Sequence, residues 1–342
     1  MRQVVLIPAY QPDSKLLATL RELQENGIER IVVVNDGSRP ECLPVLEKAA
    51  LVQGVTVLHH AANRGKGQAM KTGFNHVLLC EPAGTGVIVC DADGQHPIHS
   101  LLEVAAEMDA RPGALVLGAR QFSKAKNMPF PNLVGNTVSR LTFLLTAGLW
   151  YADTQGGLRG YPWELLPALL DNPGDRFEYE NTMLLMVRSR AIPVVEVPME
   201  AVYLGKNESS HFNRLQDSIR INGAITRWIS LPIFTALMNL GLFFLFSPRF
   251  PAWSTLVCFL ACGLSLVCNA RGFSKGKRAA PCLAGFVIAL GAAGVFGCLY
   301  HLAGWAIPGA WWLAMLPTAV VSHWCYLRMR YGKRPAFFRK AG

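Results

Sequence analysis

Two carboxylates one residue apart follow an apolar run in GVIVCDADGQHP, residues 86–97. Asp91 and Asp93 come at the end of a predicted strand, and alternate residues of a strand point to the same side. Two hard oxygen donors suit Mg²⁺ or Mn²⁺. Such an ion keeps several waters and completes its coordination shell with substrate phosphates. Gln95 adds a neutral oxygen within reach. The pattern therefore indicates a metal site, with a pair of solvated turn acids as the alternative.

Two further polar segments carry candidate binding groups. In NDGS, residues 35–38, Asp36 can accept hydrogen bonds from a base N–H or from ribose hydroxyls, although this sequence is also typical of an ordinary turn. In NRGKG, residues 63–67, glycines flank Lys66 before a helix. This arrangement presents backbone N–H groups to a phosphate, or it is a plain helix N-terminus. Two histidines after the Asp pair are interpreted as metal ligands or as surface or helix-start residues: His96 and His99.

These residues follow a series of predicted strands that alternate with helices. The strands are short runs rich in Val, Ile and Leu at 3–8, 30–35, 54–59, 86–91, 114–119 and 192–198. Helical periodicity is found between them at 13–26, 41–52, 66–80 and 98–109. Continuously apolar strands are buried on both faces, which predicts a mostly parallel sheet covered by helices. Ligands bind beyond the carboxyl ends of such strands, where the polar motifs lie.

The ordered set of motifs resembles the family 2 glycosyltransferases of the GT-A fold. The set consists of PAY, NDGS, NRGKGQA, DADGQ, GAR, DTQGGLRG and FEYE, all within residues 1–220. The nearest likeness is to the polyprenyl-phosphate branch, whose members are similar to dolichol-phosphate mannosyltransferase. The resemblance implies a Rossmann-like α/β domain that transfers a sugar from GDP-mannose or a UDP-hexose to undecaprenyl or dolichyl phosphate.

The resemblance also implies roles for single residues. The metal ion on the donor diphosphate would be held by Asp91, Asp93 and Gln95. The catalytic set would be these two aspartates with two arginines that contact phosphate, Arg120 and Arg214. Substrate contacts would come from Pro8, Tyr10, Asp36, Lys66, Lys124, Lys126, Asn136 and Ser210. One departure is PAYQPD, where Pro12 replaces the family's acid and Asp13 follows it.

Charge divides the chain at Asp217, the last of its 23 acidic residues. The 125 residues after it carry no Asp or Glu and 13 Lys or Arg, whereas the part up to Asp217 has a net charge of −3. The overall charge of +10 therefore belongs to the second part of the chain, and it does not indicate a nucleic-acid-binding surface.

The second part of the chain is expected to cross a membrane four times. Uncharged stretches of 21, 21 and 49 residues occupy 228–248, 250–270 and 279–327. About 20 apolar residues cross a bilayer, so the longest stretch is expected to hold two spans. Basic residues cluster at 271–278 and after the last stretch. By the positive-inside rule these segments, both termini and the N-terminal domain face the cytoplasm. Residues 210–228 have the pattern of a helix in the membrane interface, or of a plain amphipathic packing helix.

The expected organisation has four parts. They are a cytoplasmic GT-A domain at 1–209, the interface helix at 210–228, an all-α transmembrane domain of four helices at 229–327, and a basic cytoplasmic tail at 328–342. The four helices are similar to those of fused members of the branch or of GtrA-like membrane domains. The expected location is a bacterial-type inner membrane, with several spans.

A phosphate acceptor removes the need for a general base. The second pKa of a phosphate monoester is about 6, so the lipid phosphate is largely anionic at neutral pH. We therefore expect one in-line displacement with inversion at the anomeric carbon, in which the aspartates hold Mg²⁺ or Mn²⁺ and the metal stabilises the leaving diphosphate. Expected partners are the nucleotide sugar, the polyprenyl phosphate, the membrane and a second copy of the chain, and not nucleic acid.

Two other functions share part of this pattern. A processive polysaccharide synthase has the same sheet and Asp-x-Asp pair but carries Gln-x-x-Arg-Trp, and here Ala224 stands at the Gln position of AITRW. A non-catalytic lipid carrier or scaffold with a decayed nucleotide domain would not need a complete metal set. Turnover of nucleotide sugar by the purified protein distinguishes the enzyme from the carrier.

Overall fold

The computed structural model describes residues 2–120, 136–141, 143–144 and 149–199. Of these, residues 2–120, 136–141, 143 and 150–199 belong to one compact unit. The predictions for the interface helix, the four spans and the basic tail lie outside the described residues. Within the described ranges no helix is long and apolar enough to cross a bilayer.

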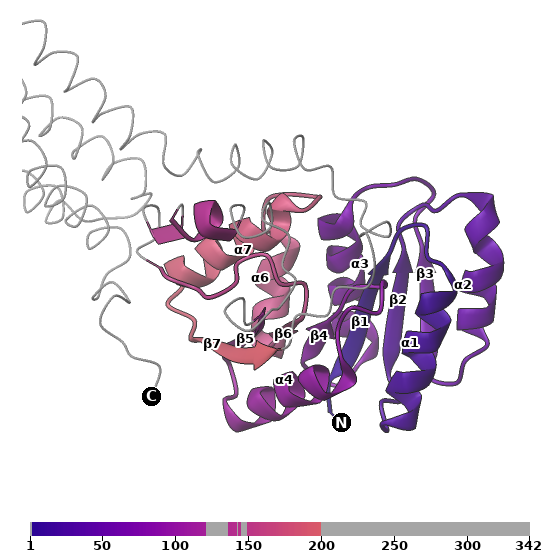
Figure 1. Cartoon of the computed structure of the whole chain (residues 1–342), viewed down its shortest axis with the longest axis horizontal. Helices are drawn as coiled ribbons and strands as arrows, with labels where there is room; N and C mark the ends of the chain where they lie inside the picture. The colour runs from indigo at the N-terminus through magenta and orange to yellow at the C-terminus, as the bar shows by residue number, and fades with distance from the viewer. Residues whose placement is uncertain (1, 121–135, 142, 145–148, 200–342) are drawn as a thin grey trace, which may run out of the picture. The chain divides into compact units, whose positions relative to one another are not determined.

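The strands of this unit form one seven-stranded sheet (Figure 1). In chain order they are β1 (Val4–Ala9), β2 (Ile31–Asn35), β3 (Val55–His59), β4 (Val87–Val89), β5 (Leu115–Arg120), β6 (Arg159–Tyr161) and β7 (Val194–Met199). Their order across the sheet is β3-β2-β1-β4-β6-β5-β7. All neighbours pair in parallel except β6, which is antiparallel to both β4 and β5. The predicted mostly parallel α/β sheet is confirmed, and the three-residue strand β6 was not foreseen.

Helices cover both faces of this sheet. They are α1 (Ser14–Glu25), α2 (Leu43–Ala50), α3 (Lys66–Cys80), α4 (Ile98–Ala110), α6 (Leu166–Leu170) and α7 (Glu178–Ser189), with short 3₁₀ turns at Pro40–Cys42 and Trp163–Leu165. Residues 136–141 are also helical. The four helices predicted before residue 110 are confirmed, with their ends displaced by a few residues. Figure 1 shows α1 and α3 on opposite sides of β1 and β2.

Side chains of the central strand alternate between two buried layers, as strand geometry requires. On β1, Val5 and Ile7 belong to a core shared with α1, α2 and α4. Leu6 points to the other face and packs against α3. A Cβ added to Gly73 of that helix would lie 2.2 Å from Cδ1 of Leu6. Val4 through Ile7 are fully buried. The continuous apolar run of this strand is explained by helices that pack on both of its sides.

Asp13, the acid that follows the departure from the family motif in PAYQPD, lies at the start of α1. Asp13 precedes the helix in extended backbone, and its side chain accepts a hydrogen bond of 2.8 Å from the amide of Lys15. This is the hydrogen bond of a helix N-cap. Asp13 therefore has a structural role at the beginning of α1.

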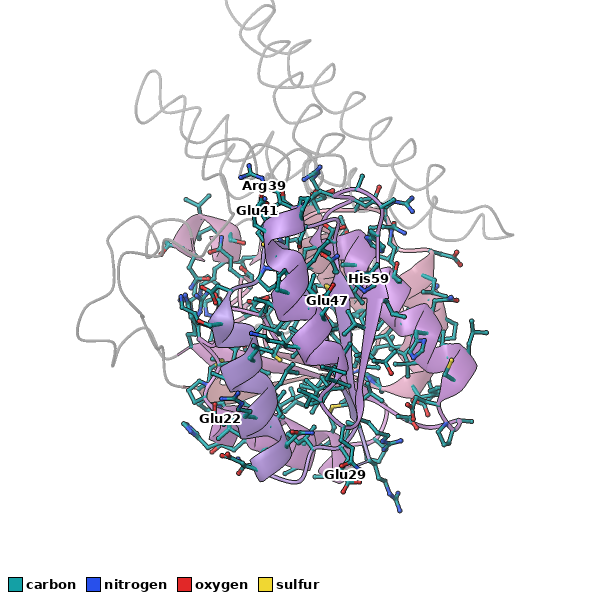
Figure 2. All side chains as sticks on the ribbon, turned by 90° about the vertical axis from the view of Figure 1, so that its right-hand side faces the viewer. Glu22, Glu29, Arg39, Glu41, Glu47 and His59 are labelled. Atoms are coloured by element: carbon teal, nitrogen blue, oxygen red, sulfur yellow. The ribbon has the colours of Figure 1, made fainter. Side chains whose placement is uncertain are left out.

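Exposed charged side chains of both signs lie on α1 and α2. The first helix exposes Arg21 and Glu22, and the second exposes Glu47 and Lys48. Figure 2 shows Glu22 and Glu47 among the side chains of these helices. The surface of the two helices is therefore mixed in charge.

The polar strand ends meet at one edge of the sheet. Ala9 at the end of β1 pairs with Asn35 at the end of β2, and β4 runs parallel to β1. Because β6 is antiparallel, its first residue, Arg159, pairs with Val89 at the end of β4. The carboxyl ends of β1, β2, β4 and β5 and the beginning of β6 are thus brought together.

Candidate functional site

The Asp91–Asp93 pair lies in the turn that links β4 to α4. β4 ends at Val89, and the turn closes where the amide of Gln95 donates to Oδ1 of Asp93 at 3.1 Å. Gly94 has a φ of +71°, which a glycine adopts without strain. Both aspartates are half-buried. The turn therefore presents two carboxylates at the polar edge of the sheet, as the sequence predicts.

Both oxygens of Asp91 have partners within the chain. The ammonium of Lys66 lies 2.7 Å from Oδ1, and Nε2 of His96 lies 3.3 Å from Oδ2. Burial alone would raise the pKa of Asp91, but the charges of Lys66 and His96 and their hydrogen bonds hold that pKa well below its usual range. Asp91 is therefore a fixed, ionised group.

The backbone of Gly157 closes the site around Asp91. A Cβ added at this glycine would lie 2.1 Å from Oδ2 of Asp91, closer than real Cβ contacts come. Residue 157 must therefore lack a side chain for the carboxylate to keep this position. This approach explains the second glycine of DTQGGLRG.

Asp93 has a different electrostatic setting from Asp91. Burial, and then the negative charge of Asp91, raise the pKa of Asp93 above its usual range. The hydrogen bond from the Gln95 amide opposes this rise. A cation beside Asp93 would relieve the repulsion between the two carboxylates.

Lys66 begins α3 and also contacts Glu180 of α7. The distance from its Nζ to Oε1 of Glu180 is 3.1 Å, and Glu180 is buried. Burial alone would lower the pKa of Lys66, but the charges of Asp91 and Glu180 raise it well above its usual value. Lys66 is thus a charged ammonium between two carboxylates. The sequence singles out FEYE as a motif, but it does not predict this contact.

The N-terminus of α3 is enclosed by the chain. A Cβ on Gly67 would lie 2.5 Å from Cβ of Tyr179, and one on Gly65 would lie 2.4 Å from the carbonyl oxygen of Asp175. That carbonyl also accepts from the amide of Gln68 at 2.9 Å. The glycines of NRGKG permit this close packing, and the predicted contact of this segment with a phosphate stays a prediction.

Asp36 fixes the loop before α3. Its carboxylate accepts from the amides of Arg64 and Gly65 at 2.8 and 2.7 Å, and it lies 2.7 Å from Nδ1 of His60. Nε2 of His60 lies 2.9 Å from Oγ1 of Thr72. The side chain of Asp36 is buried. The predicted contact of Asp36 with the nucleoside stays a prediction, beside this structural role.

A second ion pair lies at the end of β5. Arg120 donates from Nε and Nη2 to the two carboxylate oxygens of Asp153, at 2.6 and 3.1 Å. The side chain of Asp153 is fully buried, and the Gln155 amide donates to it at 2.9 Å. The sequence predicts Arg120 as a phosphate contact but misses Asp153 as its partner.

Arg159 is a buried guanidinium that binds three carbonyl oxygens. It donates from Nε to Gly156 at 2.8 Å, from Nη1 to Glu180 at 2.8 Å and from Nη2 to Thr154 at 3.0 Å. Only 1% of its surface is exposed. Arg159 thereby joins the 154–157 segment to the start of α7. One arginine beside apolar residues in GGLRGY is the only sequence signal for it.

The remaining predicted site residues fall into four groups. Pro8 and Tyr10 are half-buried at the end of β1, where a substrate contact stays a prediction. Asn136 is buried and donates from Nδ2 to the carbonyl of Ala152 at 3.1 Å, and its predicted substrate contact stays a prediction. His99 is exposed. Four predicted contacts lie outside the described residues: Lys124, Lys126, Ser210 and Arg214.

The donor set fits a hydrated divalent cation. Among the described residues no group of three or more His, Cys, Asp or Glu side chains could hold a metal ion. Mg²⁺ is commonly bound by one or two carboxylates together with waters and substrate phosphates. Asp91 and Asp93, with the nearby Gln95, supply that kind of partial shell.

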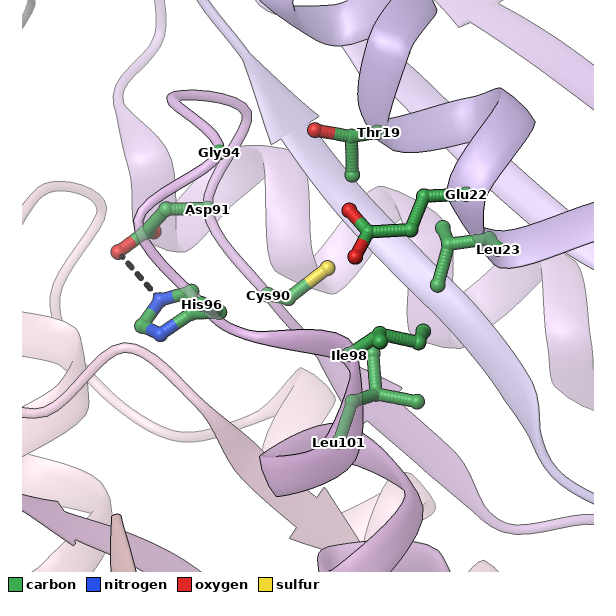
Figure 3. A pocket seen from close by; sticks show the side chains of 9 residues that line it. All are labelled: Thr19, Glu22, Leu23, Cys90, Asp91, Gly94, His96, Ile98 and Leu101. Atoms are coloured by element: carbon green, nitrogen blue, oxygen red, sulfur yellow. Dashed lines mark hydrogen bonds and ion pairs between the residues drawn. The ribbon is translucent and has the colours of Figure 1, made fainter. Parts of the chain in front are cut away.

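A small cavity lies beside this turn, between α1 and α4. It is lined by Thr19, Glu22, Leu23, Cys90, Asp91, Gly94, His96, Ile98 and Leu101 and has a volume of about 10 Å³. A space of this size holds about one water molecule. Figure 3 shows Cys90 directed toward Glu22 across the cavity, while Asp91 is directed toward His96. The cavity is too small for a nucleotide.

Comparison with known proteins gives related sequences for this domain. Residues 4–160 match the family model described as Glycosyl transferase family 2. An uncharacterized protein of Methanocaldococcus jannaschii is 31% identical over 202 residues, 58% of this chain and 81% of that protein. The UDP-N-acetylglucosamine–dolichyl-phosphate N-acetylglucosaminyltransferase of Methanococcus voltae is 27% identical over 216 residues, 58% and 85% of the two chains. The undecaprenyl-phosphate mannosyltransferase of Micrococcus luteus is 28% identical over 237 residues, 67% and 94%.

Proposed function

The chain belongs to glycosyl transferase family 2 and is a glycosyltransferase, and we propose that it transfers a sugar from a nucleotide sugar to a polyprenyl phosphate. The proposal rests on the lipid acceptors of two similar proteins. One acts on dolichyl phosphate and the other on undecaprenyl phosphate, and each is similar to this chain over more than four fifths of its own length. The donor is GDP-mannose or a UDP-hexose.

The metal belongs to the donor side of the reaction. Asp91 and Asp93, with Gln95, would hold Mg²⁺ or Mn²⁺, which neutralises the charge that develops on the leaving diphosphate. Support for this role comes from the turn between β4 and α4, which presents the two carboxylates at the polar edge of the sheet.

The reaction is an in-line displacement with inversion. The attacking group is an oxygen of the lipid phosphate, which is already anionic near neutral pH and needs no base. The contacts of Asp91 support this assignment, because Lys66 and His96 already occupy both of its carboxylate oxygens. Asp91 acts as an oriented charge.

Arginine side chains position the acceptor phosphate. Arg120 lies at the polar edge of the sheet with its guanidinium oriented by Asp153. Arg214 would add a second guanidinium, with Lys124, Lys126 and Ser210 as further contacts. The nucleoside would lie against Pro8, Tyr10 and Asp36. Guanidinium groups suit this task because they bind phosphate through two parallel hydrogen bonds.

The acid-free segment after Asp217 anchors the enzyme. Four spans at 229–327 would place the catalytic domain at the cytoplasmic face of a cell membrane, next to the polyprenyl phosphate. The 13 basic residues of this segment would attract anionic lipid headgroups.

The test uses membranes that contain the full-length chain. They are incubated with undecaprenyl phosphate and, separately, with labelled GDP-mannose, UDP-glucose and UDP-N-acetylglucosamine, and the lipid fraction is analysed by mass spectrometry. We expect one donor to give a glycosyl-phosphoryl lipid of inverted anomeric configuration, and chelation of divalent cations to stop its formation. Asp93→Asn is the matched variant and should be inactive. No product from any donor, or full activity of Asp93→Asn, would contradict the proposal.

A further inference from the structure

Lys66 occupies a position that a divalent cation would share. Its ammonium lies 2.7 Å from Oδ1 of Asp91 and 3.1 Å from Oε1 of Glu180. The side chains of Lys66 and Glu180 are 14% and 8% exposed, whereas Asp91 is 33% exposed. Asp91 is therefore the carboxylate of this trio that a solvent cation can approach.

Three carboxylates interact with the Lys66 ammonium at different distances. Asp91 and Glu180 contact it directly, and Asp93 interacts with it at longer range. A divalent cation at Asp91 would meet a positive charge already bound to the same carboxylate. Two like charges about 4 Å apart repel with several times the thermal energy at a partly buried site. Metal binding to the free enzyme is opposed by this repulsion.

We propose that Lys66 is a resident counter-cation at Asp91, which keeps a divalent cation from binding tightly until a nucleoside diphosphate binds with it. This inference rests on the proposed function, because it assigns the nucleotide as the partner of the metal. The phosphate oxygens bring negative charge that offsets the repulsion and add ligands to the incomplete shell. Lys66 then acts as a positioning residue, and metal and nucleotide bind cooperatively.

Glu180 sets how strongly Lys66 holds Asp91. It shares the ammonium with Asp91 and anchors it to α7. Replacing Glu180 by Gln leaves the ammonium to Asp91 alone and removes one negative charge near the metal. Replacing Lys66 by Met removes the competing cation. The two changes should therefore shift metal affinity in opposite directions, although each breaks the same buried ion pair.

The experiment measures Mn²⁺ binding to the purified full-length chain by electron paramagnetic resonance. Titrations are done with Mn²⁺ alone, with UDP and with GDP. For the wild type we expect one nucleotide to tighten Mn²⁺ binding about tenfold or more. Lys66→Met should bind Mn²⁺ alone about tenfold more tightly than the wild type and lose most of this coupling. Glu180→Gln should bind Mn²⁺ alone more weakly than the wild type.

Controls separate this effect from damage to the fold. Lys71→Met is the matched control, since Lys71 lies on the same helix and pairs with the exposed Asp175 at 3.2 Å; its Mn²⁺ affinity should equal that of the wild type. The double variant Asp91→Asn/Asp93→Asn lacks both proposed carboxylate ligands, so any Mn²⁺ that it binds is bound elsewhere on the chain. The double variant Lys66→Met/Glu180→Gln removes both partners of the buried pair, so it remains testable if Lys66→Met does not fold.

The inference is overturned if Lys66→Met and Glu180→Gln both weaken Mn²⁺ binding, which is the pattern of structural damage. It is also overturned if Mn²⁺ binds the wild type equally well with and without either nucleotide. Its failure is distinct from that of the proposed function. Sugar transfer without Mn²⁺–nucleotide coupling would refute the role of Lys66 alone, and coupling without transfer to lipid would refute the acceptor alone.

Discussion

Arg120 and Asp153 are joined by two hydrogen bonds, from Nε to Oδ2 at 2.6 Å and from Nη2 to Oδ1 at 3.1 Å. Asp153 is fully buried, whereas 26% of the Arg120 side chain is exposed. The pair therefore fixes the direction of a guanidinium on a partly exposed side chain. Two parallel bonds restrain a planar group more than one bond does.

Asp153→Asn should lower kcat for sugar transfer by about tenfold or more, because the neutral amide cannot hold Arg120 by two charged hydrogen bonds. Arg120→Lys should have a similar effect, since an ammonium lacks the fork of donors. Kinetics of labelled-lipid formation measure both. Arg39→Lys, at an exposed position (Figure 2), is the control and should retain wild-type rates. If Asp153→Asn is fully active, the orientation of Arg120 by Asp153 does not matter.

Gly157→Ala should abolish activity while leaving most of the stability. The added methyl group would stand 2.1 Å from Oδ2 of Asp91, so the carboxylate must move away from its position. Activity and thermal unfolding of the full chain are compared. Gly27→Ala is the control: its φ is +76° and nothing lies within 4 Å of an added Cβ. It should lose about 1 kcal/mol of stability through backbone strain and keep its kcat. Equal activity of both variants would show that Asp91 tolerates displacement.

Arg159→Met should destabilise the catalytic domain by at least about 3 kcal/mol, because three buried carbonyls lose their donor. Arg159→Lys should recover only part of this loss, since one ammonium does not reproduce the fork. Pulse proteolysis in urea reports the free energy of unfolding. The comparison is Arg111→Met, which breaks the surface pair with Glu107 and should cost less than about 1 kcal/mol. A similarly small cost at residue 159 would contradict the role given to Arg159.

Stability should fall steeply above pH 10. Burial raises the pKa of Tyr151, Tyr161 and Tyr179 well above the ordinary value of 10.0. The unfolded chain then releases phenolic protons that the folded chain keeps, so the free energy of unfolding decreases by about 1.4 kcal/mol per pH unit for each tyrosine. Below pH 10 these groups add no pH dependence.

Tyr161→Phe should make the fall in the free energy of unfolding above pH 10 less steep, by about 1.4 kcal/mol per pH unit. Unfolding is measured between pH 7 and pH 11 for the wild type and the variant, and the difference at pH 7 serves as the reference. A slope that does not change would show that the phenol of Tyr161 ionises in the folded chain as it does in the unfolded one.

The parallel part of the sheet is predictable because each strand is a continuous run such as VVLIPA or IVVVN, buried on both faces. β6 escapes prediction because three residues, RGY, carry no periodicity. The Asp pair is also visible in sequence, since the strand end and the two acids are local. The contact between Lys66 and Glu180 joins positions 114 residues apart and depends on how α7 packs on α3. Residue type alone does not specify such a pair.

Buried polar side chains are the other group that escapes prediction. Asp153 and Arg159 stand in a motif that marks the family, but their roles depend on carbonyl and guanidinium positions that only the folded chain defines. Asp36 is a third case. Its type predicts a nucleoside contact, which stays a prediction, but the sequence does not reveal that its oxygens also accept hydrogen bonds from the loop before α3.

The antiparallel strand β6 delays the pairing of two earlier strands while the chain is synthesised on the ribosome. It lies between β4 and β5, which precede it in the chain. Those two strands therefore have no partner on that side until residue 161 has been synthesised. Gly157 and Glu180 are also supplied late, so a nascent chain carries Asp91 and Asp93 well before their surroundings exist. At about 5–20 residues per second, translation leaves several seconds in which the facing edges of β4 and β5 are unpaired.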